Sequence, residues 1–463
     1  MTADDITRGR TRTGTGPGVP GQRQPGAPGP PVPAPGGGAA ARPADTPAGR
    51  VVPGGFRVSA RTLRALASTE PSPEGMALVR DVRWSKRLVL LRAVLDAAPA
   101  GGEAGAHWEL LEAAERQDPG AVRDVLLYPS TGVWAEETLR RLHAPDGPAA
   151  DLAHLGSLAA AAALRAGIPF EITLRPVQGR IALPTLGLLR PHRLGPVPLS
   201  EGAWDPDHPA VLPLHALPGG RTALDDLDPY RAVPGSPGPV RPARRLTPKG
   251  HKRWDTQWTG ALTLLERYDT ARAGEIAGLL RSVVPLAGGT RSAGATLPAA
   301  AGSVLVRGQA PPALAATLVH ETQHGKLGAL TDVLPLHTGD GTARYWAPWR
   351  ADPRPLEGLL HGAYAHLALA CYWQRAALYG ARAAWACHAR CRAQVAAVLP
   401  VLQSETRLTK AGREFVAAMV EAERTMDELP PPADQHATAR RALEQERRAW
   451  CEAHPELAAS ARG

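Results

Sequence analysis

The chain has 463 residues, with 53 Lys and Arg against 44 Asp and Glu, which gives a formal net charge of +9 and a pI of about 9.8. A hydrophobic content of 44% is enough for a folded core, and the longest apolar stretch, near residues 158–164, is far too short to cross a bilayer. The basic balance raises the question of nucleic-acid binding, but no DNA- or RNA-binding motif accompanies it. The sequence therefore predicts neither a nucleic-acid nor a membrane partner.

The first half of the chain divides by composition into two parts. Residues 1–55 are rich in Pro, Gly, Ala and Arg and carry almost no large apolar side chains, which predicts a disordered tail. Residues 56–250 are predicted to form a mostly helical N-terminal region with one β-hairpin, made by residues 170–174 and 179–183. The predicted helices of this region span residues 61–68, 77–98, 108–117, 120–128, 134–143 and 151–166.

The second half contains a longer helical pattern. Residues 251–429 are predicted to form a catalytic region, in which a helix over 254–280 breaks near Thr270 and strands over 282–286 and 303–306 precede a helix over 313–330. Further helices are expected over 355–377, on to about 399, and over 404–429. Residues 430–463 are predicted to form a charged C-terminal helix after three prolines. The predicted fold class is α+β, mainly helical, with a zincin-like strand and motif helix.

The most specific pattern is His320-Glu321-Thr322-Gln323-His324, an H-E-x-x-H motif inside the predicted helix over 313–330. Two histidines four residues apart on a helix share one face and reach a single metal ion. The motif therefore predicts a mononuclear metal site with His320 and His324 as ligands and Glu321 as a catalytic residue.

A third ligand is needed, because catalytic sites usually have three protein ligands and keep the other positions open. The extended metzincin motif is excluded, because Leu327 and Leu330 occupy the positions where it requires Gly and His. The helix over 355–377 offers three candidates. His361 is the predicted third ligand, and His366 and Glu357 are the alternatives; His337, in a polar loop, is a weaker candidate.

The segment over residues 343–355 is unusually rich in Trp, Arg and Pro. One interpretation is a rigid loop whose Trp side chains cover the core and whose Arg side chains cap helix ends or pair with Asp352. The other is an anion clamp beside the metal, in which Arg350 and Arg354 bind a carboxylate, since guanidinium groups match carboxylates with two parallel hydrogen bonds. The two interpretations can hold for different residues.

Only four cysteines occur in the chain, which favours a reducing cytoplasmic location. Cys387 and Cys391 lie four residues apart with His388 between them. A second metal site needs more ligands than this, so these cysteines are predicted to be ordinary thiols.

Three blocks of the sequence, residues 318–330, 348–355 and 360–365, resemble the actinobacterial HExxH-motif peptide β-hydroxylases. Similarity to this family extends over about residues 56–425. It includes four shorter blocks, at residues 83–88, 129–134, 183–187 and 283–286.

The resemblance implies an Fe(II) centre, 2-oxoglutarate and O₂ as co-substrates, and a ribosomally made precursor peptide as substrate, sometimes beside a radical-SAM cyclophane synthase. It implies that His320, His324 and His361 bind the iron and that Arg350 or Arg354 pairs with the distal carboxylate of the 2-oxo acid. Glu321 then orients a water molecule or a ligand histidine.

Two other functions fit the bare motif. In a zinc metallopeptidase, the same histidines bind Zn²⁺ and Glu321 deprotonates the metal-bound water that attacks the peptide. In a binding module, the metal site is structural and the protein presents a peptide to a partner enzyme.

Overall fold

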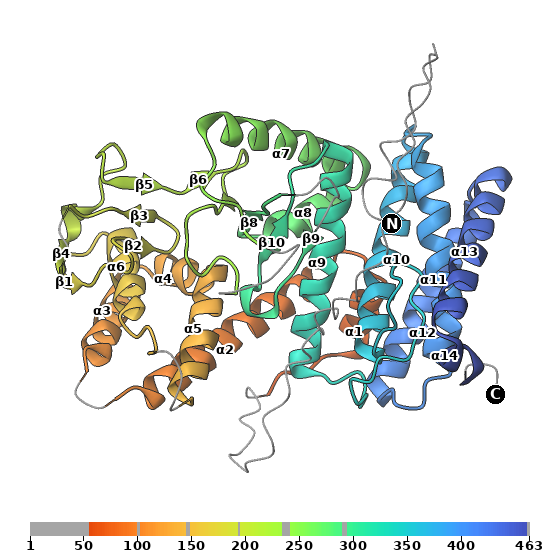
Figure 1. Cartoon of the computed structure of the whole chain (residues 1–463), viewed down its shortest axis with the longest axis horizontal. Helices are drawn as coiled ribbons and strands as arrows, with labels where there is room; N and C mark the ends of the chain where they lie inside the picture. The colour runs from red at the N-terminus through yellow and green to blue at the C-terminus, as the bar shows by residue number, and fades with distance from the viewer. Residues whose placement is uncertain are drawn as a thin grey trace, which may run out of the picture.

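The computed structural model describes residues 55–99, 102–144, 149–192, 195–233, 241–288 and 294–460 (Figure 1). The predicted disordered tail over residues 1–55 lies outside the described residues, apart from Gly55. Within the described part, the chain is mainly helical with small sheets, as predicted. None of its helices is long and apolar enough to cross a membrane.

Six helices form the N-terminal region, and all six were predicted from the sequence. Their starts are set by local chemistry: Ser59 and Ser72 accept hydrogen bonds from backbone N–H groups of the first turns that follow them, and Pro73 and Pro119 lie in first turns. The helices are α1 (Ala60–Ala67), α2 (Pro73–Ala97), α3 (Ala104–Gln117), α4 (Pro119–Leu126), α5 (Pro129–Leu142) and α6 (His154–Ala166).

The predicted β-hairpin has different partners in the structure. Strand β1 (Glu171–Leu174) pairs antiparallel with β4 (Val197–Ser200), whereas β2 (Ile181–Leu183) pairs with β3 (Gly187–Leu189), which in turn pairs with β5 (Val211–Pro213). The expected turn does form, because Val177 and Arg180 exchange backbone hydrogen bonds across it. The pairing does not extend beyond this isolated bridge. The prediction that residues 170–174 and 179–183 pair was therefore wrong.

A five-stranded sheet lies at the centre of the molecule in the order β6-β7-β8-β10-β9. The two predicted strands are confirmed as β8 (Ser282–Pro285) and β10 (Ser303–Val306), which run parallel to each other. The other strands are short: β6 (His215–Ala216), β7 (Ala223–Leu224) and β9 (Gly294–Ala295), and β9 pairs antiparallel with β10. Two helices, α7 (Pro248–Tyr268) and α8 (Thr270–Leu279), precede β8, and the predicted break between them falls at Asp269, the N-cap residue of α8.

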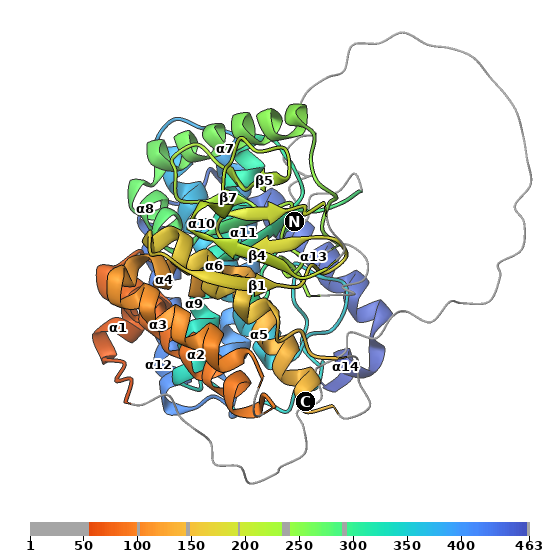
Figure 2. The ribbon, with the colours of Figure 1, turned by 90° about the vertical axis from the view of Figure 1, so that its left-hand side faces the viewer.

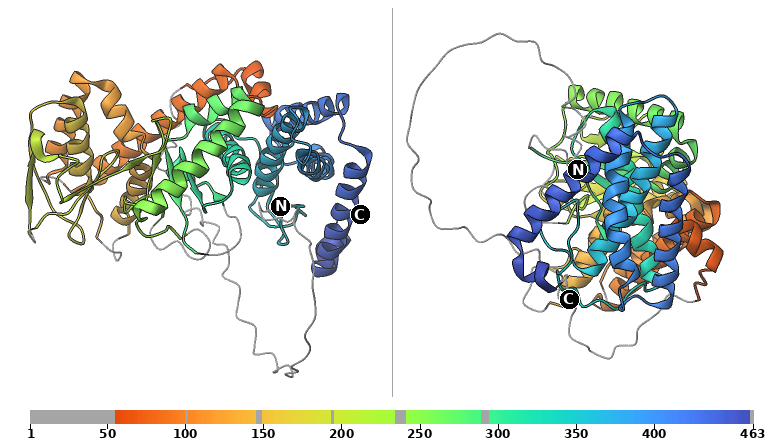
Figure 3. Two further views of the ribbon diagram at one scale, coloured as in Figure 1. Left: turned by 90° about the horizontal axis from the view of Figure 1, so that it is seen from above. Right: turned by 90° about the vertical axis from the view of Figure 1, so that its right-hand side faces the viewer.

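The C-terminal part is a stack of helices on one side of the sheet, seen from the side and end-on in Figure 3. They are α9 (Pro311–Val333), α10 (Leu356–Leu378), α11 (Ala384–Gln403), α12 (Lys410–Thr425), α13 (Ala433–Ala453) and α14 (Pro455–Ser460). Helix α10 packs against both α9 and α11, and α13 covers α11. The charged helix predicted after the three prolines is confirmed as α13.

Two hydrophobic cores divide the molecule. The larger joins α1 to residues from Leu217 to Met426, and the smaller joins residues from Leu91 to Val211. The sheets of the smaller core, with α3 and α6, lie at the opposite end of the molecule from α13 (Figures 1 and 2). Helix α2 connects the two halves, because its Leu91 and Val94 belong to the smaller core while its Val79 and Val82 pack with Leu279 and Ala329 in a separate small cluster. This position brings α2 against the motif helix.

Candidate metal site and its cavity

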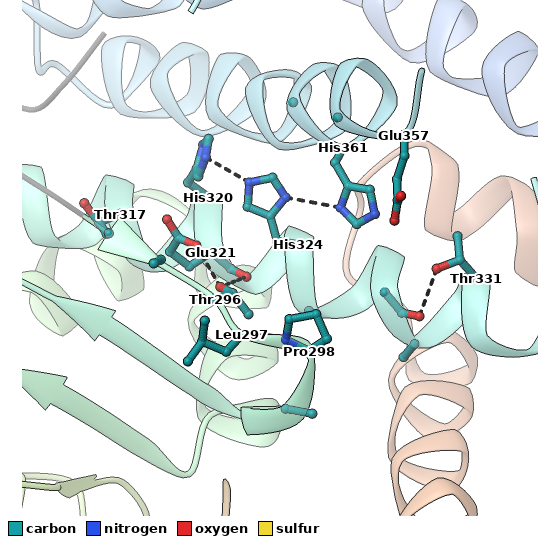
Figure 4. Close-up of a pocket in the computed structure, with 18 of the residues that line it drawn as sticks. Thr296, Leu297, Pro298, Thr317, His320, Glu321, His324, Thr331, Glu357 and His361 are labelled. Carbon is teal, nitrogen blue, oxygen red and sulfur yellow. Dashed lines mark hydrogen bonds between the residues drawn. The ribbon is translucent and has the colours of Figure 1, made fainter. Parts of the chain in front are cut away.

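The H-E-x-x-H motif lies in the middle of α9, which begins with Pro311 and Pro312 in its first turn. The Nε2 atoms of His320 and His324 lie 3.1 Å apart, and their rings meet edge to face (Figure 4). Two imidazole nitrogens bound at about 2.1 Å to one metal ion stand about 3 Å apart. The pair therefore has a spacing that suits two ligands of one ion.

Four histidines from two helices meet at this point. On α10, His361 points toward His324, and the Nδ1 atoms of these two residues lie 3.4 Å apart (Figure 4). This contact uses the His324 nitrogen that does not face His320. Glu357 lies beside His361 on the exposed start of α10.

His366 has different surroundings. It is buried, its ring meets the edge of the His320 ring with centroids 5.2 Å apart, and the indole of Trp349 stacks on it at 4.4 Å. Its Nδ1 donates a hydrogen bond of 2.8 Å to the carbonyl of Gly362. This bond leaves Nε2 with the lone pair, which is the arrangement that metal-binding histidines usually have.

No three His, Cys, Asp or Glu side chains within the described ranges are already arranged around one metal position. The prediction of His361 as third ligand stays a prediction. His337 does not line the cavity next to the motif, and its Nδ1 accepts a hydrogen bond from the N–H of Gly339.

The histidines are held in the neutral form. Burial lowers the pKa of His324 to about 4 and the pKa of His366 and His361 to about 3, and it brings the pKa of His320 well below its usual value. Neutral imidazole is the form that binds metals, so at neutral pH none of these residues must lose a proton first.

Glu321 is buried and makes a contact that the sequence did not predict. Thr296 Oγ1 donates to Glu321 Oε2 at 2.7 Å, and burial raises the pKa of this carboxyl group to about 7 (Figure 4). A Cβ atom on Gly294 would lie 2.8 Å from the other carboxylate oxygen. The segment that includes β9 therefore packs directly on Glu321.

A cavity of about 920 Å³ opens beside the motif. Its lining includes His320, Glu321 and His324 from α9, and Glu357, His361 and His366 from α10. The remaining walls come from α2, from Gly132 and Glu136 on α5, from residues 294–301, from the loop before α10 and from Cys391 on α11. A volume of this size is typical of sites that bind small molecules.

The Trp- and Arg-rich loop forms one wall of this cavity. Arg350 and Arg354 both line it, and both contact Asp352, at 2.8 Å and 3.3 Å. Backbone hydrogen bonds between Tyr345 and Arg354 close the loop. The rigid-loop interpretation is confirmed for these pairs, whereas the anion clamp stays a prediction.

Trp349 explains why residue 362 is glycine. A Cβ atom at Gly362 would overlap the indole of Trp349, which stacks on His366.

We expect Gly362→Ala to lower the free energy of unfolding by about 1–3 kcal/mol, because overpacking displaces the indole. Chemical denaturation measures this change. Gly328→Ala is the control: residue 328 lies on α9 with nothing within 4 Å of the added atom, so this variant should be stabilised by up to about 1 kcal/mol. Equal stabilities of the two variants would contradict the packing argument.

A buried ionic cluster supports the motif helix from behind. Lys326 Nζ lies 2.6 Å from Glu275 Oε1, and Gln323 donates to Glu275 Oε2 at 3.3 Å. Arg272 lies 3.6 Å from the same carboxylate. The signal in the sequence is a pair of polar residues, Gln323 and Lys326, three apart and therefore on one face of the motif helix.

The cysteine prediction concerns Cys387 and Cys391, which both lie on α11. All four cysteines are free thiols. Burial raises the pKa of Cys387 to about 11 and of Cys391 to about 12, and His388 donates to the carbonyl of Ala370. These residues are packed core thiols, in agreement with the prediction.

No protein-family model matches the chain, and no curated protein has a significantly similar sequence.

Proposed function

We propose that this protein is an Fe(II)- and 2-oxoglutarate-dependent hydroxylase that installs a β-hydroxyl group on a side chain of a ribosomally made precursor peptide. The observation that carries the proposal is the pair of neutral histidine nitrogens, 3.1 Å apart, on the wall of a cavity of about 920 Å³ that also presents arginines. The resemblance of the sequence blocks to the peptide β-hydroxylases supports the choice of iron and 2-oxoglutarate.

The arrangement around α9 supports the zincin-like part of the predicted fold. Strand β10 leads into α9 after a short loop. Strand β9 pairs antiparallel with β10 and forms the edge of the sheet. Residues after β9 then contact Glu321. This places the edge of the sheet beside the motif, where an extended peptide could lie along it.

We assign the ligands as His320 and His324, through Nε2, with His366 as the third. The hydrogen bond from His366 to the Gly362 carbonyl and the stacked Trp349 support this choice over His361. In the proposed arrangement His361 contacts the second nitrogen of His324 and orients its ring.

Bound iron with 2-oxoglutarate would supply the oxidation: one atom of O₂ enters a peptide C–H bond as hydroxyl, and the other enters succinate as CO₂ leaves. The chain's own residues position the reactants. The cavity walls would surround the acid, and Trp349 and Thr296 fix the orientations of His366 and Glu321.

One observation favours the alternative, a zinc metallopeptidase. The pKa of Glu321 is raised to about 7, which suits a general base at neutral pH. Thr296 already donates to one oxygen of this carboxylate, and the other oxygen remains for a water molecule under either function. The hydroxylase is preferred because the sequence blocks resemble the peptide β-hydroxylases.

The decisive experiment incubates the protein with Fe(II), 2-oxoglutarate, O₂ and the short peptides encoded beside its gene. We expect a peptide to gain the mass of one oxygen atom while succinate forms in equal amount. Peptide fragments that appear without 2-oxoglutarate would refute the hydroxylase and support the peptidase.

Glu321→Gln separates the two functions a second time. A peptidase would lose about 10²–10⁴-fold in rate, because it needs the carboxylate as a base. We expect the hydroxylase to keep its rate within about tenfold, because the amide oxygen can still accept the hydrogen bond from Thr296. Single-turnover mass spectrometry measures both products in the same sample.

A further inference from the structure

The cavity beside the motif extends along α9 to both sides of the histidines. Between Ala316 and Thr331, every residue of α9 that is not buried lines the cavity. These residues recur every three or four positions, so they form one face of the helix. Figure 4 shows Thr317, the two motif histidines and Thr331 in a row along this face. At about 1.5 Å per residue, the cavity is a groove about 22 Å long, hereafter the α9 groove.

The histidines lie inside this groove and not at one of its ends. Along the helix axis, His320 is about 6 Å from Ala316, and His324 is about 10 Å from Thr331. An extended peptide rises about 3.3 Å per residue. The α9 groove therefore has room for about two peptide residues on one side of the histidines and about three on the other.

The end of the groove near the start of α9 is apolar. Helix α10 runs antiparallel to α9, since the earlier of its two motif-facing histidines contacts His324 and the later one contacts His320. Leu369 and Trp373, which come further along α10, therefore line the groove toward the start of α9, on the side of Ala316. Apolar side chains of a ligand would be buried at this end.

The other end of the groove, near the C-terminus of α9, is charged. Lys86 Nζ lies 2.9 Å from Asp332 Oδ2, and a Cβ atom on Gly325 would lie 2.9 Å from Arg83 Nη2. The two arginines of the loop before α10 also line the groove, where they share the carboxylate of Asp352. From α2, α5, α9 and α10, the lining has charges of both signs: Arg83, Lys86, Arg87, Glu136, Asp332 and Glu357.

This division of the groove favours a peptide over other long ligands. A nucleic-acid strand would bring its phosphates against Glu136, Asp332 and Glu357, and a purely apolar chain would leave the charged end without partners. A peptide has apolar and charged side chains on one regular backbone. Strand β9, at the edge of the sheet, begins beside the groove, because a Cβ atom on Gly294 would lie 2.7 Å from Thr317 Cγ2. Such an edge can pair with an extended backbone.

We infer that the α9 groove binds an extended peptide segment of about six or seven residues, with apolar side chains toward Trp373 and charged side chains toward Asp332. The residue that lies at the histidines is then internal to the peptide, with neighbours on both sides. The inference rests on the proposed function for the reaction at that residue, and it adds which sequence surrounds the residue and where in the peptide it lies.

The test measures the binding of labelled synthetic peptides to the full-length chain by fluorescence anisotropy, without added 2-oxoglutarate. One mixture contains peptides of about seven residues with an apolar half and a charged half, in either order. The control mixture contains the same residues in scrambled order. We expect the divided peptides to bind about tenfold or more tightly than the scrambled ones, the effect of burying one further apolar side chain.

Two variants each close one end of the groove. Ala316→Phe fills the apolar end, and Gly328→Phe fills the charged side, where nothing lies within 4 Å of an added Cβ atom. Each should weaken binding of the divided peptides by about tenfold or more, because an internal residue at the histidines needs both sides. Gly274→Phe is the matched control and should bind like the wild type, since residue 274 is an exposed glycine of α8 with equally open surroundings and does not line the cavity.

Equal binding of divided and scrambled peptides by the wild type would overturn the inference, and this comparison needs no variant. Circular dichroism identifies any variant that fails to fold. Among folded variants, a loss of binding in only one of Ala316→Phe and Gly328→Phe, or in neither, would also overturn it, because the peptide would then end at the histidines or lie elsewhere.

The reaction provides a separate result. Peptide binding that depends on both ends of the groove supports the inference even if no oxygen is transferred, and that failure would count against the hydroxylase alone. Oxygen added only to a terminal residue of a peptide would count against the groove alone.

Discussion

Replacing His324 by Ala is expected to weaken Co(II) binding to the metal-free protein by more than about 100-fold. His324 holds the centre of the histidine group: its Nε2 lies 3.1 Å from His320 Nε2 and its Nδ1 lies 3.4 Å from His361 Nδ1. In the proposed site, its loss removes a metal ligand and leaves His361 without the ring it contacts. Loss of an outer partner alone usually costs about 10–100-fold in affinity, so loss of a ligand should cost more. Visible absorption of bound Co(II) measures this without any turnover.

The other histidines provide the comparison. His366→Ala should resemble His324→Ala, whereas His361→Ala should lose only about tenfold, as an orienting partner does. His337→Ala, outside the cavity, should bind Co(II) like the wild type. If His361→Ala loses as much as His324→Ala and His366→Ala loses nothing, then His361 is the third ligand, as the sequence first predicted.

The elements around the site were predictable because their limits are set by local chemistry. Pro311 and Pro312 mark the start of α9, and Asp269 caps α8 at the predicted break. Strand pairing was less predictable, since β1 could pair with either of two later segments, and its choice of β4 depends on the packing of the smaller core. Alternation of side chains identifies a strand but not its neighbour.

The two motif histidines were predictable for the same local reason, since helical spacing alone brings them together. The choice between His361 and His366 as the proposed third ligand could not be predicted from the sequence. It depends on how α10 is rotated against α9 and on where Trp349 lies. Gly362 carried part of that information: it indicated a close approach, and the approaching group is the Trp349 indole. Arg83 and Arg87 lie far from the motif in sequence, and only the packing of α2 against α9 brings them to the cavity.

The buried ionic cluster behind α9 leads to the second large effect. Lys326→Met is expected to lower the free energy of unfolding by about 3–5 kcal/mol, because Glu275 would keep a buried negative charge after losing its closest partner. Arg272, at 3.6 Å from the same carboxylate, should hold the loss toward the lower end of that range. Denaturant titration followed by circular dichroism measures it.

A matched pair that joins α2 to the same helix, α9, provides the control. Lys86 and Asp332 also join a lysine to a carboxylate at 2.9 Å, but their side chains are 41% and 37% exposed. Lys86→Met should therefore cost less than about 1 kcal/mol, and high salt should reduce that cost further. The cost of Lys326→Met should not depend on salt, because water and ions do not reach the buried pair.

Combining Lys326→Met with Glu275→Leu should destabilise the protein by less than the sum of the two single changes, since it removes both charges together. Equal losses in Lys326→Met and Lys86→Met would mean that the cluster does not stabilise the motif helix.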